Sequence, residues 1–256
     1  YARMLADDRK FSFKPGEFDT LKLDVKYEGI RPYLHLRDLC EQIDLGDHAL
    51  PYTIGSARAE QHGHDAFGEV VFSRYGTDDA RLTRRIVLTA EGCLIIRDQW
   101  TAGKSKPKWT AGQLWQFYAM KEQGKDWFCS EDDGAFNVPD GHGQTKPVTR
   151  QMLVKFATDA GTETFVEQVN QSYLAPNPKK RPQDKFFTTG SKRTVSAGEE
   201  SSFTLVVVPH EPSQSAKSIA DGISFNEKPD GVEVTIGKSA QVTMHRDGSW
   251  EVVRRP

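Results

Sequence analysis

The chain has 256 residues, of which 36 are acidic and 34 are basic, so its formal net charge is −2. A nearly neutral chain has no general electrostatic attraction for nucleic acid or for an anionic membrane, and the sequence predicts neither partner. No apolar run approaches the roughly 20 residues that span a bilayer. The length suits one large domain, and 21 glycines, 13 prolines and short apolar runs favour a turn-rich sheet protein.

Most segments of the chain have the alternation or the β-branched content of strands. Residues 1–20 are an entry segment, and residues 32–45 suit either a strand pair or a short helix. The region 214–221 predicts one short helix. Strands are predicted at 21–27, 69–75, 113–120, 152–157, 163–173, 185–188, 192–195, 202–209, 232–236, 240–245 and 249–253.

Two of these strand groups have predicted connections. Residues 152–173 predict a hairpin, and the last three strands predict an antiparallel meander because Gly-containing turns separate them. Strand 202–209 is apolar on both faces, which is typical of a central position in a sheet.

A further hairpin is predicted for residues 84–100, RRIVLTAEGCLIIRDQW, with its turn at Ala90-Glu91-Gly92. The two-residue period of a strand puts Asp98 on one face with two aliphatic side chains. A carboxylate there needs a hydrogen bond, a cation or a metal, because bare burial costs on the order of several kcal/mol. Asp98 is therefore either a site residue or the partner of an arginine such as Arg84 or Arg85.

Together these elements predict an all-β fold, namely a large antiparallel β-sandwich of more than ten strands with at most one or two short helices. We expect residues 1–256 to form this single domain.

The polar stretch 46–68 holds three of the seven histidines and is the best loop candidate for a site. Alternation puts His62 and His64 on one side of an extended segment, which suits a metal ion or a sugar carboxylate. The alternative is a solvated histidine pair. His48 lies close to Tyr52 in the sequence, and these residues can form a proton-transfer pair. The candidate catalytic residues are His62, His48 and Tyr52.

Two further groups suit an acidic glycan. Flat indole rings stack on sugar faces, so Trp100 and Trp115 are candidate substrate-binding residues, although a tryptophan in a sandwich more often belongs to the core. The basic, proline-rich run PNPKKRPQDK contains Lys179 and Arg181. These cations can contact a polyanion or simply form a solvated surface.

Three stretches taken together resemble a known family. They are RRIVLTAEGCLIIRDQW, QLWQFYA and ESSFTLVVVPHEP, and they look like the C-terminal β-sandwich of heparinase II/III-type polysaccharide lyases. In that family an arginine-led strand precedes a strand whose hydrophobic run ends in aspartate, and a late strand ends in proline. The resemblance covers residues 69–209.

The resemblance implies an N-terminal α/α toroid that packs against the sandwich, with an acidic polysaccharide bound between them. It also implies β-elimination, in which a Tyr or His removes the uronate C5 proton while a cation or hydrogen-bond donors neutralise the carboxylate. Residues 1–44 are too few to form the toroid. We therefore expect the chain to be the C-terminal part of a longer, secreted or periplasmic lyase that carries the toroid elsewhere.

Relatives in this family also hold zinc in the sandwich through His and Asp ligands. His62-Gly63-His64 resembles the pair in which one histidine faces the substrate and the next binds zinc, so the resemblance implies His64 as a zinc ligand. Asp98 resembles the aspartate ligand. Gln116 stands where some relatives offer a third ligand, but an amide is a poor zinc ligand, and Gln116 is counted with the substrate-binding residues.

The predicted function is thus the β-sandwich portion of a polysaccharide lyase that cleaves a uronate-containing glycan by β-elimination. The alternative is a non-catalytic carbohydrate-binding or structural β-sandwich module that packs on a partner domain. No close pair of carboxylates in the sequence marks the acid and base of a glycosidase.

Overall fold

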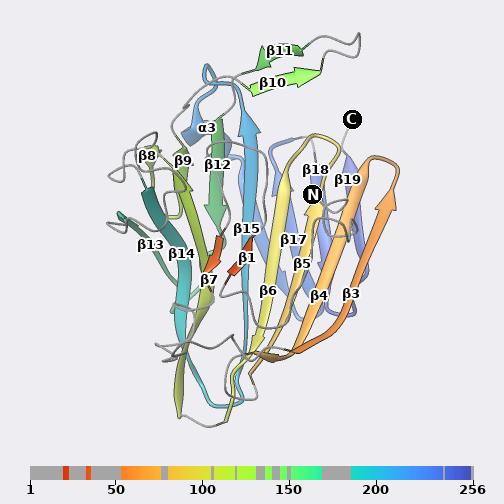
Figure 1. Cartoon of the computed structure of the whole chain (residues 1–256), viewed down its shortest axis with the longest axis vertical. Coiled ribbons are helices and arrows are strands. Elements are labelled where there is room, and N and C mark those ends of the chain that lie inside the picture. Colours follow the sequence, from red (N-terminus) through yellow and green to blue (C-terminus); the bar gives the residue numbers. More distant parts are fainter. Residues whose placement is uncertain are drawn as a thin grey trace.

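The structure is a computed structural model, and it describes residues 20–22, 33–35, 53–75, 80–104, 107–118, 120–130, 136–139, 145–148, 151–168, 186–238 and 240–254. Antiparallel strands dominate this part of the chain, and α3 (Ala216–Asp221) is its one helix (Figure 1). The predicted all-β fold is confirmed. No helix among the described residues has the length and apolar character needed to cross a membrane.

An eight-stranded antiparallel sheet is the largest element of the fold. Its strands in spatial order are β3 (Thr53–His62), β4 (Asp65–Tyr75), β5 (Ala80–Leu88), β6 (Leu94–Thr101), β15 (Glu200–His210), β12 (Gln151–Phe156), β9 (Trp127–Ser130) and β8 (Met120–Gln123). Strand β15 lies between β6 and β12, which confirms the central position predicted from its two apolar faces.

Smaller sheets complete the described fold. One consists of β13 (Glu163–Gln168), β14 (Phe186–Ser196) and β7 (Lys108–Tyr118). The C-terminal sheet consists of β16 (Ile223–Lys228), β17 (Gly231–Ile236), β18 (Ala240–His245) and β19 (Trp250–Arg254). Two further pairs are β1 (Thr20–Lys22) with β2 (Tyr33–His35), and β10 (Phe136–Pro139) with β11 (Thr145–Val148).

The eight-stranded sheet packs on both of its faces, because successive residues of its central strands enter different cores. In β15, Val206 and Val208 belong to a core shared with α3 and the C-terminal sheet, which lies behind β3 to β6 in Figure 1. Leu205 and Val207 belong to a second core, to which β7 contributes Trp115. Strands in this position need apolar residues on both faces, which explains the continuous apolar runs.

The predicted hairpin at 152–173 is wrong. Strand β12 pairs with β9 and β15 in the eight-stranded sheet, whereas β13 pairs with β14 in the three-stranded sheet. The connection therefore carries the chain from one layer to another instead of reversing it within a sheet. A turn at Gly161 is compatible with either arrangement, and only the long-range partners decide between them.

Other local predictions are confirmed. Strands β5 and β6 form the predicted hairpin, and β17 to β19 form the predicted meander. Its turns contain Gly237 and Gly248 at φ values of 58° and 86°, a region that favours glycine. The predicted short helix is confirmed, but it begins at Ala216 instead of 214, because Ser215 caps it by accepting a hydrogen bond from the backbone N–H of Ser218.

Asp98 forms a buried ion pair with Arg84 of the neighbouring strand. The two residues are directly opposite each other, and their exposed fractions are 0% and 3%. Arg84 Nε donates to Asp98 Oδ1 at 2.6 Å, and Arg84 Nη2 donates to Oδ2. The guanidinium also lies over the Trp115 ring, 5.2 Å from its centroid, so the pair links two sheets. The structure thus selects the salt-bridge alternative for Asp98.

Removing one partner of this pair is expected to destabilise the protein strongly. Asp98→Ala leaves Arg84 charged and buried, which costs about 3–5 kcal/mol. Asp221→Ala is the matched control, because its pair with Lys217 is exposed and contributes at most about 0.5 kcal/mol. Urea denaturation of both variants measures the difference. Equal losses of stability in the two variants would contradict a core role for the Arg84–Asp98 pair.

Candidate functional site

The structure does not bring the predicted zinc ligands together. Leu94 of β6 and Ala66 of β4 lie at the same level in the sheet, because both pair with Leu88 of β5. Asp98 lies four residues along β6 from Leu94. This offset corresponds to about 13 Å, and His64 lies beyond Ala66 at the end of the sheet. Asp98 also uses both carboxylate oxygens on Arg84. Within the described residues no three His, Cys, Asp or Glu side chains can share a metal ion, so these residues do not fit zinc.

The two tryptophans predicted to bind sugar belong to the core. Trp100 is 4% exposed and Trp115 is 6% exposed, so neither ring presents an open face to a sugar in this structure. The backbone of Gln116 lies in β7 opposite Thr188, and its side chain is outside the described part. The remaining predicted residues lie outside the described residues and stay predictions: His48, Tyr52, Lys179 and Arg181.

Residues His62–Asp65 form a tight turn between β3 and β4, which we call the histidine turn. The sequence predicted an extended segment in a loop here, but His62 is the last residue of β3 and pairs with Asp65 across the turn. Gly63 has a φ of 61°, as the tight connection requires. Both imidazoles are exposed. The turn therefore presents two histidines to solvent from a tight hairpin.

The His62 ring stacks on Trp250 of the C-terminal sheet. The ring centroids are 4.5 Å apart and the planes differ by 16°. Trp250 is 8% exposed, also stacks on Phe67 at 5.7 Å, and donates from Nε1 to Glu60 Oε2 at 3.1 Å. The imidazole of His62 thus rests on a buried aromatic support.

Arg254 of β19 joins the histidine turn to the β5–β6 turn. Its guanidinium donates to both oxygens of Asp65, at 2.9 and 2.5 Å, and Nε donates to Glu91 Oε1 at 2.7 Å. These hydrogen bonds lower the pKa of Asp65 and of Glu91 below their usual values, and they raise the pKa of Arg254. We call this group the Arg254 clamp.

The imidazole nitrogens of the histidine turn can accept or donate hydrogen bonds and can take part in proton transfer. Its neighbouring carboxylate, Asp65, is engaged by Arg254 and by the backbone N–H of Ala90 at 2.8 Å, which suits it to a structural role. The exposed imidazoles are therefore the groups of this surface that are available for chemistry.

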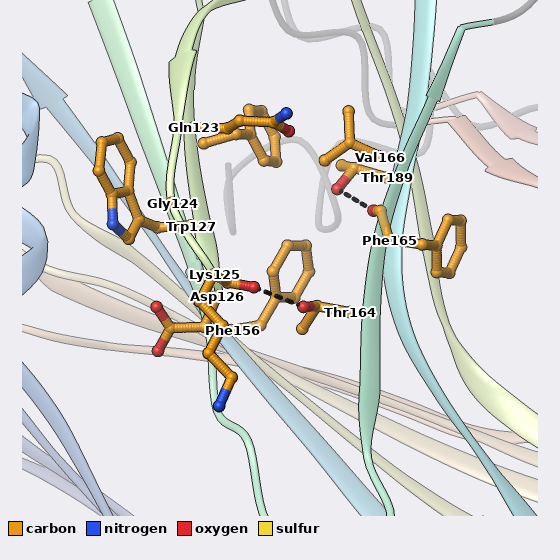
Figure 2. Close-up of a pocket in the computed structure, with 11 residues that line it drawn as sticks. Gln123, Gly124, Lys125, Asp126, Trp127, Phe156, Thr164, Phe165, Val166 and Thr189 are labelled. Carbon is orange, nitrogen blue, oxygen red and sulfur yellow. Dashed lines mark hydrogen bonds between the residues drawn. The ribbon is translucent and has the colours of Figure 1, made fainter.

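A cavity of about 340 Å³ opens at the other edge of the eight-stranded sheet, facing β13 and β14 (Figure 2). The ring of Phe156 points into it but is only 2% exposed. Thr164 Oγ1 donates to the Lys125 carbonyl at 2.7 Å, and Thr189 Oγ1 donates to the Phe165 carbonyl at 2.8 Å. These hydrogen bonds use both threonine hydroxyl protons, and Gln123, Lys125 and Asp126 also line the cavity.

Sequence reasoning selected the two histidines but missed their supports. Trp250 and Arg254 lie far from the histidines in the chain, and the Glu60–Trp250 hydrogen bond spans 190 residues. No spacing rule connects such positions. The one available signal was a tryptophan, Trp250, as the second residue of the predicted strand 249–253, just after a predicted turn.

The Arg254 clamp predicts a pH-dependent contribution to stability. Because pairing lowers the folded-state pKa of Asp65 and Glu91, the clamp stabilises the fold fully above the unfolded carboxyl values of about 4. This contribution is lost as the pH falls through the lower folded-state values. We expect Arg254→Gln to be less stable than wild type in urea denaturation at about pH 7, with a difference that shrinks below about pH 4.

Arg81→Gln is the control for this measurement, because it makes the same change at another exposed arginine. A difference between wild type and Arg254→Gln that stays constant down to about pH 3 would show that Asp65 and Glu91 are not the partners that matter.

Comparison with known proteins gives a likeness in fold. No known protein-family pattern and no curated protein matches the sequence. Among solved structures, a mutant of the heparan sulfate lyase HepC from Pedobacter heparinus matches 81% of this chain with a TM-score of 0.50 and 12% identity. The unmutated HepC has a TM-score of 0.49 and 13% identity over 81% of the chain. A structure of heparinase III matches 81% of this chain with a TM-score of 0.44 and 12% identity.

The matched region covers 29% of the chain in each of these three structures. At 12% identity the HepC likeness concerns the fold alone. It confirms the fold that the sequence resemblance implied: the chain folds like a part, just under a third, of a heparan sulfate lyase.

Proposed function

We propose that this chain is the β-sandwich portion of a polysaccharide lyase that cleaves a uronate-containing glycan by β-elimination. The fold likeness to HepC over 81% of the chain carries the proposal. The exposed histidine turn supports it, because a lyase needs a proton acceptor that an extended polymer can reach. An acidic polysaccharide is the substrate class that follows, and a secreted or periplasmic location is proposed with it.

The proposed reaction balances without an external reactant. A base removes the C5 proton of the uronate, the C5–H electron pair forms the C4–C5 double bond, and the C4–O bond breaks. The departing oxygen takes a proton from an acid or from water. A neutral imidazole suits the first step, and hydrogen-bond donors to the uronate carboxylate lower its barrier by stabilising the carbanion.

His62 is the proposed base, and His64, two residues further on, is the proposed donor to the uronate carboxylate. Both imidazoles are exposed at the end of the eight-stranded sheet, so a glycan chain can approach them without rearrangement of the core. No step of this proposal uses zinc, because the described residues do not fit that ion.

The chain spans 29% of the length of the lyases that it matches, so the remaining machinery is proposed to lie outside it. An α/α toroid domain of the same polypeptide is the proposed partner, with the glycan bound between the toroid and the sandwich. His48, Tyr52, Lys179 and Arg181 remain candidate contacts of the same glycan.

A non-catalytic carbohydrate-binding or structural module is the second candidate function. The placement of Asp98, Trp100 and Trp115 favours it, because three residues predicted to act on a ligand have core roles instead. A module of this kind would bind its glycan or its partner domain without producing unsaturated product.

The two functions predict different outcomes in one assay. We expect the chain, tested in its natural polypeptide, to generate ultraviolet absorbance of unsaturated uronate from one of four polymer classes: alginate, heparin-type, chondroitin-type or ulvan-type. Loss of the base in His62→Ala is expected to lower kcat at least about 100-fold, as for other general bases. His64→Ala is expected to lower kcat and also to raise KM, because it removes a donor to the uronate carboxylate.

His245→Ala is the matched control, because this partly exposed histidine pairs with Asp230 and is not a proposed contact of the glycan, and the activity of this variant should equal that of wild type. Absence of product from all four polymers, together with retained glycan binding, would replace the lyase with the binding module.

A further inference from the structure

The stack between His62 and Trp250 restricts the position of the imidazole. An exposed histidine at the end of a strand normally samples several rotamers, but a ring 4.5 Å away and nearly parallel covers one imidazole face. His62 and Phe67 lie on the same face of the β3–β4 pair, and Trp250 lies over both rings. One face of the His62 ring is therefore covered by Trp250, which restricts the ring's orientation, while the side chain as a whole stays exposed.

Trp250 is itself held on several sides. It is the first residue of β19 and lies opposite Met244, whose side chain is fully buried. Its Nε1 donates to Glu60, and Glu60 also accepts from Arg58 at 2.8 Å. Four residues along β19, Arg254 clamps Asp65 at the far end of the histidine turn. The C-terminal sheet thus supports the turn at both His62 and Asp65.

We infer that Trp250 is a positioning residue that orients the His62 imidazole for its work on a ligand. Trp250 is too buried to contact a substrate broadly, so its effect acts through His62. The inference rests on the proposed function for its catalytic consequence, because orientation of a general base is what makes proton transfer efficient. The C-terminal sheet, whose Trp250 bonds Glu60 across 190 residues of sequence, thereby becomes part of the functional unit.

Proton NMR tests the orientation without any substrate. A ring stacked on an indole has its signals moved upfield by the ring current, and the His62 signals are identified by their loss in His62→Ala. We expect Trp250→Leu to move them downfield and Trp250→Phe to restore part of the upfield shift. Trp109→Leu is the matched control, because Trp109 is buried to a similar degree, at 7% exposed, in another strand. His62 signals unchanged in Trp250→Leu would overturn the inference.

Kinetics of β-elimination test the consequence. We expect Trp250→Leu to lower kcat about 100-fold, the effect of a misplacement of about 1 Å, with KM close to wild type. Trp250→Phe keeps an aromatic face under His62 and should recover most of kcat. Trp109→Leu should lower stability without this selective loss of kcat. Thermal unfolding of each variant shows which ones are folded under the assay conditions.

The outcomes separate the inference from the proposed function. Full activity in His62→Ala overturns the proposed base. Inactive His62→Ala together with a folded Trp250→Leu of wild-type kcat overturns the positioning role alone. If Trp250→Leu does not fold, Glu60→Ala decides, because it removes the acceptor of the indole N–H from a side chain that is 36% exposed. A lower kcat at unchanged KM supports the inference, and a wild-type kcat overturns it.

Discussion

Burial on both faces is the constraint on which the central sheet depends. Strand β15 sends alternate residues into two separate cores, and neighbouring β5, β6 and β12 do the same. Such strands cannot show the one-sided alternation of a sheet that faces water, and they must satisfy any charge within the protein. The bidentate pair of Arg84 and Asp98 meets this requirement, with the Trp115 ring closing over the guanidinium.

This constraint changes the meaning of the residues that carry the family resemblance. An arginine-led strand followed by a hydrophobic strand that ends in aspartate describes two neighbours of a buried sheet, with Arg84 directly opposite Asp98. The motif is therefore a feature of the fold and not of an active site, and the likeness to HepC in fold agrees with that interpretation. Chemistry has to be sought where side chains reach solvent, and the histidine turn is such a place.

The histidine turn combines exposure with support. Its two imidazoles are open to solvent, yet the backbone that carries them is a tight hairpin held by the Arg254 clamp and by Trp250. Function on a loop that a rigid scaffold positions is a common arrangement, because the scaffold supplies the order that a loop lacks. Here the scaffold includes β19, so the C-terminal sheet supports the histidine turn as well as covering a core.

The sequence by itself determined the all-β class, the hairpin of β5 and β6, the C-terminal meander and the short helix, because periodicity, turn glycines and a serine cap act within a few residues. Only the tertiary structure decided which sheet each strand joins, as the separation of β12 from β13 shows. It also decided that Asp98 meets Arg84 instead of zinc and that His62 rests on Trp250. Those contacts depend on pairing and layer packing between distant segments, and no local pattern encodes the energy of such long-range choices.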